Sequence, residues 1–362
     1  MCSLFYSKFS QFQGLSAFCA RRHRCQGMTL VELMVSLVVG LLITLAAISA
    51  LIVTRQGFST VDAASQLRDN GRFSADMIQR IALQAGFKDP LYAITPPSGK
   101  DLTDDALGLI PANVTGFNNA KAKTTDLTTA TARTSGEVGY GSDVLILRYQ
   151  TAKLNNDTSS SAAAAADGTM IDCAGNAINT IPIDRNDRMV SVFHVAVGSD
   201  GEPSLMCSRS NNGLAPYSAQ PIIQGVENFQ VLYGVDGFTS VNTAFTGATD
   251  SVPEKYLRAN QMVVGGDPSS KATYDNWRRV RSIRIGMVLR GALNSQQERV
   301  SQTFYPFFGF RKDSSSDTPG FALSTADTDS SPDKGTRFTP AIDGRLRQVV
   351  TFTIHLRNDQ GL

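Results

Sequence analysis

The feature that most constrains this chain is an apolar run near its amino terminus, residues 33–53, which contains no charged side chain. An α-helix rises about 1.5 Å per residue, and about 20 apolar residues are needed to cross the hydrocarbon layer of a membrane. The run is therefore long enough to span a bilayer as a single helix. A chain that carries it has to bury this surface in lipid or against other protein.

The charges around the apolar run predict its orientation. No acidic residue occurs before Glu32, whereas four basic residues do: Lys8, Arg21, Arg22 and Arg24. Because basic flanks stay on the cytoplasmic side, we expect the residues after the run to lie outside the cytoplasm. The 32 acidic residues all follow Gly27 and outnumber the basic ones there. Overall charge therefore gives no reason to expect nucleic-acid binding.

The five cysteines fall into two groups. Three precede Gly27, whereas Cys173 and Cys207 lie far downstream. No CxxC pair occurs, and no Cys/His cluster has metal-ligand spacing. An even pair of cysteines in an exported domain is typical of a disulfide. We therefore expect a bond between Cys173 and Cys207, with two buried free thiols as the alternative.

Glu32 lies at the start of the apolar run, where a buried carboxylate is costly. A secretory signal peptide has no use for such a group, and its cleavage site would follow the run. The sequence GMTLVE, residues 27–32, instead resembles the type IV prepilin cleavage motif. This resemblance implies cleavage after Gly27 by a prepilin peptidase and methylation of the new terminus at Met28. It also implies that Glu32 pairs with the amino terminus of a neighbouring subunit and sets the register of assembly.

A second periodic segment follows the apolar run. Apolar residues recur there at helical spacing, namely Phe58, Val61, Ala64, Leu67, Phe73, Met77 and Ile81. Gly86 is a candidate helix C-cap, and Pro90 follows it. We expect one helix over residues 28–85 whose carboxyl-terminal half packs on its own domain. Asn70–Gly71 is the expected interruption, because glycine costs about 1 kcal/mol inside a helix.

Residues after the helix predict a β-rich domain. Five segments have strand patterns: 143–150, 189–197, 229–235, 283–289 and 350–356. The alternation in 229–235 predicts a half-buried strand. No βαβ alternation occurs, so we expect an antiparallel sheet. Three polar inserts, residues 118–135, 151–169 and 312–334, are expected to be exposed loops.

Further segments resemble the PilW family of minor pilins. They are residues 69–73 with 84–87, residues 223–234, Trp277 with residues 280–285, and residues 345–350 with 356–358. The resemblance implies an α+β, pilin-like fold in which a long N-terminal helix packs on an antiparallel β-sheet with long loops. It also implies a division of the chain into a leader peptide (1–27), a transmembrane helix (28–54), an amphipathic helix (55–86) and an exported β-rich domain (87–362).

The same resemblance implies a function. The chain is expected to be a minor pilin of a type IV pilus, a non-catalytic subunit that helps to initiate pilus assembly and sits at or near the filament tip. Its implied partners are other minor pilins, the major pilin, the prepilin peptidase, the inner membrane and a pilus-tip adhesin. Before assembly it would cross the inner membrane once, with its carboxyl-terminal domain in the periplasm; afterwards it would lie in the pilus on the cell surface.

Two alternatives remain open. One is a J-class-like pseudopilin of a type II secretion system, which is similar to this family. The other is a surface-binding tip adhesin module whose exposed loops recognise a ligand. Neighbouring genes would separate them, because a group of small prepilin genes beside a large adhesin gene favours the pilus and a secretion operon favours the pseudopilin.

No catalytic, cofactor or metal site is predicted. The GxSxG, HExxH and P-loop motifs are absent. His194 and His355 lie in strand patterns and are expected to be exposed or hydrogen-bonded. A possible calcium loop at Asp327, Asp329, Asp333 and Gly335 fails the EF-hand spacing, so a solvated acidic loop is expected instead.

One basic cluster occurs, formed by Arg278, Arg279, Arg281 and Arg284. A strand places Arg279 and Arg281 on one face and Arg284 on the other, which breaks the patch. We therefore expect a solvated edge or a contact with another subunit there, rather than a nucleic-acid site.

Overall fold

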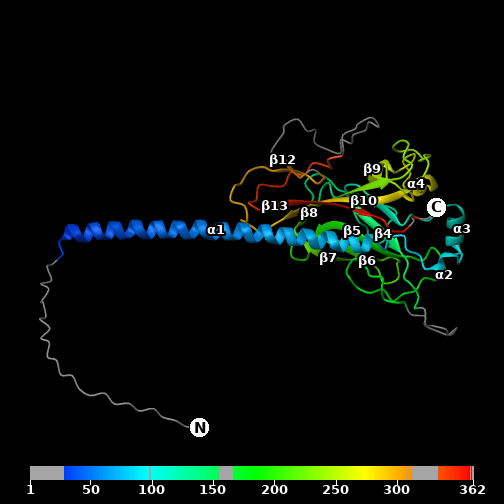
Figure 1. The fold of residues 1–362 in the computed structure, drawn as a ribbon, viewed down its shortest axis with the longest axis horizontal. Coiled ribbons are helices and arrows are strands. Elements are labelled where there is room, and N and C mark those ends of the chain that lie inside the picture. Colours follow the sequence, from blue (N-terminus) through cyan, green and yellow to red (C-terminus); the bar gives the residue numbers. More distant parts are fainter. Residues whose placement is uncertain are drawn as a thin grey trace, which may run out of the picture. The chain divides into compact units, whose positions relative to one another are not determined.

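The computed structural model describes residues 28–97, 99–154, 166–307, 309–311, 333–358 and 360, which fall into two compact units, Met1–Arg55 and Gln56–Leu362 (Figure 1). The helices are α1 (Leu30–Ala82), α2 (Pro90–Ala93), α3 (Lys100–Ala106), η1 (Ala259–Gln261) and α4 (Lys271–Trp277). The strands are β1 (Val114–Phe117), β2 (Ala120–Lys121), β3 (Thr131–Ala132), β4 (Val144–Tyr149), β5 (Met189–Val197), β6 (Pro203–Arg209), β7 (Ser218–Gln224), β8 (Val226–Val235), β9 (Lys255–Leu257), β10 (Val280–Arg290), β11 (Thr303–Tyr305), β12 (Gly309–Arg311) and β13 (Arg347–His355). The predicted leader with Gly27, and Asp327 and Asp329, lie outside the described residues.

The first unit contains the amino-terminal part of α1. The Thr29 hydroxyl accepts a hydrogen bond from the Glu32 backbone N–H at 3.2 Å, which satisfies one free donor at the helix start. Within the apolar run, hydroxyl groups donate to helix carbonyls three or four residues earlier, as those of Ser36, Thr44 and Ser49 do. These side chains therefore satisfy their donors inside the helix, as a lipid environment requires.

The part of α1 in the second unit buries one face. The buried residues are Ala63, Leu67, Gly71, Ser74, Ile78, Ile81 and Ala82. The prediction that this half packs on its own domain is confirmed, but the predicted apolar stripe is wrong in part. Phe58, Val61 and Phe73 are 72%, 70% and 53% exposed. Small residues form much of the buried face because the sheet approaches the helix closely there.

Gly71 shows this close approach. A Cβ atom added at Gly71 would lie 2.6 Å from Cγ2 of Val350 in β13. The helix continues through Asn70 and Gly71 without a break, so the predicted interruption is wrong. The glycine serves the packing of helix against strand, and that gain offsets its low helix propensity.

The carboxyl-terminal end of α1 is fixed by several contacts. Gly86 has a positive φ of 78°, and its N–H donates to the Arg148 carbonyl at 2.9 Å. The Asn358 side-chain amide donates to the carbonyls of Leu83 and Ala85, both at 3.1 Å. The helix ends at Ala82 and not at residue 85, and Gly86 bonds to Arg148 and not to a helix carbonyl, so the predicted cap at Gly86 is wrong. Asn358, near the carboxyl terminus of the chain, instead satisfies two carbonyls of the turn that follows the helix.

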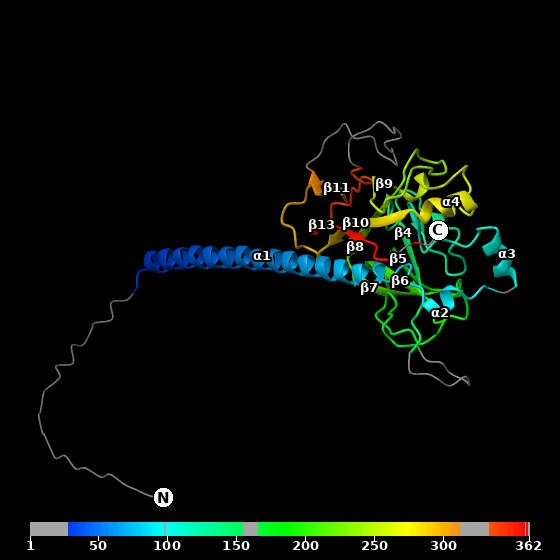
Figure 2. The same cartoon turned by 45° about the vertical axis from the view of Figure 1, so that its right-hand side comes forward.

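Two antiparallel sheets form the body of the second unit (Figures 1 and 2). One has the order β1-β4-β5-β6-β7 and the other the order β13-β10-β8-β9. All five predicted strands are present, and the antiparallel arrangement and the α+β class are confirmed. The expectation of one sheet is wrong. One core cluster spans both sheets and includes Leu147, Phe193, Phe229 and Ile285.

Strand β8 is buried along all ten residues, so the predicted half-buried strand is wrong. Its polar side chains are covered by distant segments and bonded to them. The Gln230 side chain accepts from the Thr336 N–H at 2.7 Å and donates to the Thr336 carbonyl at 2.9 Å. Asn228 donates to the Tyr140 carbonyl at 3.2 Å. The alternation pattern predicts that these polar side chains bond to water, whereas in the structure they bond to other parts of the domain.

The insert 118–135 is also more ordered than predicted. It contains β2 and β3, and Asn119 and Arg133 within it are buried. The Arg133 guanidinium donates to the carbonyls of Ala120, Val138 and Val195. Asn119 donates to the Arg133 carbonyl at 2.9 Å. Buried polar side chains thus organise this segment by bonding to backbone groups, which the polar composition did not reveal.

Candidate functional site

The amino-terminal part of α1 presents an apolar surface that no described residue of its unit covers. Every residue from Met28 to Ser59 is exposed. The large apolar side chains in the charge-free run are between 48% and 66% exposed, among them Leu37, Val39 and Val53. α1 is long and apolar enough to cross a membrane. A water-soluble unit cannot leave so large an apolar surface in water, so this segment is built to contact lipid or other subunits.

Glu32 is the only acidic side chain among residues 28–55. It occupies the first turn of α1, where the helix dipole favours a negative charge. Its carboxylate has no hydrogen-bond or ionic partner among the described residues. The structure thus leaves this group available to a partner from outside the described residues.

A second apolar surface lies on the part of α1 in the second unit. Phe58, Val61 and Phe73 project from the face opposite the buried one, where Asp69 and Asp76 also lie. Sequence reasoning assigned these apolar residues to the core. Their exposure adds a mixed apolar and charged surface that could contact another subunit.

The predicted disulfide is present in the second unit. Cys173 and Cys207 are bonded, and both are fully buried. Cys207 lies in β6, and the Cys173 N–H donates to the Ser191 hydroxyl of β5 at 3.0 Å. The bond therefore attaches the segment before β5 to the middle of the five-stranded sheet.

His194 and Ser208 form a pair that sequence reasoning did not find. His194 Nε2 lies 2.8 Å from Ser208 Oγ, across β5 and β6, and both residues are buried. Burial, with a smaller contribution from Arg133, lowers the pKa of His194 to about 4. No carboxylate bonds this imidazole among the described residues. A buried, neutral imidazole without access to a substrate joins two strands and does not activate a nucleophile.

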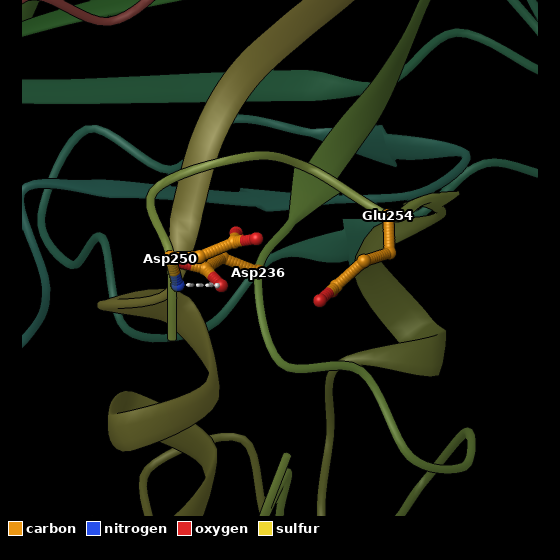
Figure 3. Close-up of side chains that lie close together, drawn as sticks. All are labelled: Asp236, Asp250 and Glu254. Atoms are coloured by element: carbon orange, nitrogen blue, oxygen red, sulfur yellow. Dashed lines mark hydrogen bonds between the residues drawn. The ribbon is translucent and has the colours of Figure 1, made fainter. Parts of the chain in front are cut away.

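Asp236, Asp250 and Glu254 are the carboxylates that come closest to a metal-binding arrangement among the described residues (Figure 3). One oxygen from each lies within 4.8 Å of the others, and oxygen ligands of this type suit Ca²⁺ or Mg²⁺. However, each carboxylate already accepts a backbone N–H: Asp236 from Asp250 at 3.1 Å, Asp250 from Val252 and Glu254 from Phe238. The cluster therefore folds the loop after β8, and no metal is assigned to it.

The arginines of the basic cluster have separate partners, and β10 lies between β13 and β8, so the expectation of a solvated edge strand is wrong. Arg281 pairs with Asp236 at 3.3 Å, whereas Arg284 lies 5.9 Å from the centre of the Phe307 ring. Asp333 forms a two-pronged ion pair with the buried Arg258, at 2.6 and 2.7 Å. Arg258 holds the pKa of Asp333 below its usual value despite burial. Asp333 thus serves as an ion-pair partner within the domain.

Two family models match this chain. Residues 192–358 match the model described as type IV pilus-assembly protein W, PilW, and residues 22–48 match the prokaryotic N-terminal methylation motif. A solved structure, that of a type IV-like pilin from Thermus thermophilus, is also similar. It covers 80% of this chain and 97% of the other at 12% identity, with a TM-score of 0.31. No protein of curated function matches significantly.

The amino-terminal motif, the exposed apolar helix and the match over residues 192–358 are features of a type IV pilin-like protein. The resemblance to the PilW family that the sequence predicts is confirmed by the match over residues 192–358. These features are consistent with a membrane-anchored pilin that interacts with other pilus components.

Proposed function

We propose that this chain is a minor pilin of a type IV pilus, which helps to initiate assembly and lies at or near the filament tip. It performs no catalysis. The observation that carries this proposal is the apolar segment of α1, whose side chains are all exposed and which directly follows a prepilin-type motif. The PilW match over the carboxyl-terminal domain supports a role in assembly, because the family is described by that role.

The proposed maturation involves three residues. A prepilin peptidase cleaves after Gly27, the new terminus at Met28 is methylated, and Glu32 pairs with the Met28 ammonium of an adjacent subunit. Two unpaired charges in an apolar filament core would each cost several kcal/mol, and their pairing offsets that cost. The exposed carboxylate of Glu32 and its position in the first helical turn support this assignment.

The proposed location changes during assembly. The precursor crosses the inner membrane once through residues 28–54, with residues 55–362 in the periplasm, and later enters the pilus on the cell surface. A disulfide between buried cysteines supports an oxidising compartment for the domain. Other minor pilins and the major pilin would cover the apolar surface of α1, and the domain could carry a tip adhesin.

The test is deletion of the gene and complementation with the wild-type chain. The proposal expects a strong decrease in the number of pili by electron microscopy, restored by complementation. It also expects the protein in sheared filaments at far lower copy number than the major pilin, with immunogold label near one filament end. Normal pili that lack the protein would contradict the proposal. Normal pili with impaired protein secretion would favour the pseudopilin alternative.

A further inference from the structure

A basic pocket in the second unit has no role in the proposed function. Its volume is about 630 Å³. The segment before β1, the residues before β5, and α4 with the turn that follows it form its walls. The helices α2, α3 and α4 lie together near the carboxyl terminus of the chain (Figures 1 and 2). Six basic residues line the pocket: Lys88, Arg185, Arg188, Lys271, Arg278 and Arg279.

Two acidic residues line the same pocket, and both are already engaged. Asp105 pairs with Arg185, and Asp275 is shared between Lys271 at 2.5 Å and Arg278 at 2.7 Å. The lining residues therefore leave a net charge of four positive units. A cleft lined by an excess of positive charge concentrates anions.

Three of these cations, Lys88, Arg188 and Arg279, have no carboxylate partner, and Arg279 instead donates to the Gly247 carbonyl at 2.9 Å. The Lys88 ammonium has no hydrogen-bond or ionic partner among the described residues. Arg188 makes one side-chain hydrogen bond, from Nη1 to the Asn113 side-chain oxygen at 2.8 Å, and its Nε is buried without a partner. Burial lowers the pKa of both groups, and the nearby arginines lower each further, while Asp105 opposes part of this effect at Lys88.

Other shielded arginines of the domain have acceptors for their donors, either carboxylates or, for Arg133 and Arg148, backbone carbonyls and a hydroxyl. Arg347 pairs with Glu227 and Asp343, Arg290 pairs with Glu202 and Glu227, and Arg258 pairs with Asp333. A shielded cation without a counter-charge costs stability, so its retention needs a reason. The pocket thus has what a ligand site requires: free donors, excess charge and sufficient volume.

We propose that this pocket binds a phosphate group through Lys88 and Arg188. Guanidinium and ammonium groups are the usual protein ligands of phosphate, and both line this pocket. The pocket is larger than one phosphate ion, so the group can belong either to inorganic phosphate or to a small phosphate monoester. This inference concerns the second unit alone and does not rest on the proposed role in a pilus.

The experiment is isothermal titration calorimetry of the full chain in a nonionic detergent. The titrants are inorganic phosphate, glycerol 3-phosphate, and sodium chloride at matched ionic strength. The proposal expects one site per chain for a phosphate titrant and none for chloride. Tighter binding of glycerol 3-phosphate would identify a monoester as the source, and tighter binding of inorganic phosphate would identify the free ion.

Variants test the assigned residues. Lys88→Gln and Arg188→Gln should each weaken phosphate binding at least about tenfold, the usual loss for a charged hydrogen bond. Arg188→Lys keeps the charge and should retain part of the affinity if Arg188→Gln fails to fold. Lys334→Gln and Arg299→Gln, which alter exposed cations outside the pocket, should bind as the wild type does. Absence of phosphate binding, or equal affinity in all variants, would overturn the proposal.

Discussion

The two units of this chain differ in how far their apolar side chains are buried. Residues 28–55 leave every side chain exposed, and the Glu32 carboxylate has no partner there among the described residues. The second unit buries large side chains such as Tyr149, Phe193 and Phe229 completely. Its shielded polar groups bond mostly to each other, as Gln230 does with Thr336.

The contrast shows where each unit obtains its stability. The second unit can gain its free energy of folding from contacts within the chain. Residues 28–55 of the first unit leave their apolar side chains exposed, so contacts with lipid or with other chains would stabilise them. Changes in the first unit should therefore affect maturation and assembly, whereas changes in the second should affect domain stability.

The largest expected effect concerns Gly27. Replacement by leucine should abolish cleavage and leave the precursor in the membrane, because the resemblance places the peptidase cut directly after this small residue. Mass spectrometry of the amino-terminal peptide measures the outcome. Gly40→Leu is the matched control, because Gly40 has open space around it and lies within the helix; it should be cleaved normally. A Gly27→Leu chain that still begins at Met28 would rule out prepilin processing.

The disulfide gives the next effect, confined to the second unit. It closes a loop with a sequence separation of 34 residues. Replacement of both Cys173 and Cys207 by serine should lower the free energy of unfolding by about 3–4 kcal/mol, because the unfolded chain regains the entropy of the open loop. Chemical denaturation measures the change. Membrane insertion and cleavage should be unaffected. A loss of either would contradict the expectation that changes in the second unit affect only domain stability.

The buried His194 should make the free energy of unfolding depend on pH, with a contribution of about 3 kcal/mol. Its pKa is lowered to about 4, so its contribution to stability is present above the unfolded value near 6.5 and is lost as pH falls toward 4. Burial raises the pKa of Asp143 to about 6, so the stability of the folded state declines as pH rises from about 4 to 6. The two effects oppose each other over nearly the same range. The wild-type free energy of unfolding should therefore change little between pH 4 and 6.

The variant His194→Gln should expose the contribution of Asp143. Its free energy of unfolding should fall by roughly 3 kcal/mol between pH 4 and 6, as measured by denaturant titration at several pH values. His355→Gln, which alters an exposed histidine of β13, should keep the wild-type profile. If the free energy of unfolding of His194→Gln did not change with pH, the effects of His194 and Asp143 would not oppose each other in the wild type.

Two glycines of α1 give the smallest effect. Gly71→Ala should destabilise the domain by about 1–3 kcal/mol, because the added Cβ meets Val350 at 2.6 Å in a packed region. Gly57→Ala has open space and should stabilise the helix by up to about 1 kcal/mol. Thermal unfolding of both variants measures the difference. Equal effects at the two sites would mean that β13 does not press against Gly71.

Sequence reasoning succeeded where a residue's role depends on near neighbours or on composition. The apolar run, the antiparallel strands and the cysteine pair were all predicted in this way. It failed where distant segments meet. The pattern did not show that Val350 approaches Gly71, that Thr336 covers Gln230, or that Phe73 faces away from the core.

The candidate sites likewise differ in whether their residues are close together in the sequence. Met28 and Glu32 were predicted from a local motif, and their roles remain proposals. The His194–Ser208 pair, the carboxylates around Asp236 and the pocket at Lys88 and Arg188 bring together residues far apart in the sequence. No periodicity or spacing rule connects such residues, so only the fold could reveal them.

The most direct test of the contrast between the units is incorporation of Glu32 variants into filaments. Glu32→Gln and Glu32→Leu should be cleaved, inserted and folded as the wild type is, with the disulfide and thermal unfolding unchanged. An unpaired Met28 ammonium in an apolar filament core is costly, so the amount in sheared pili should fall about tenfold or more. Asp76→Asn, an exposed carboxylate in the second unit, should be incorporated normally. Normal incorporation of Glu32→Leu would contradict the account and show that this subunit joins the filament through its second unit alone.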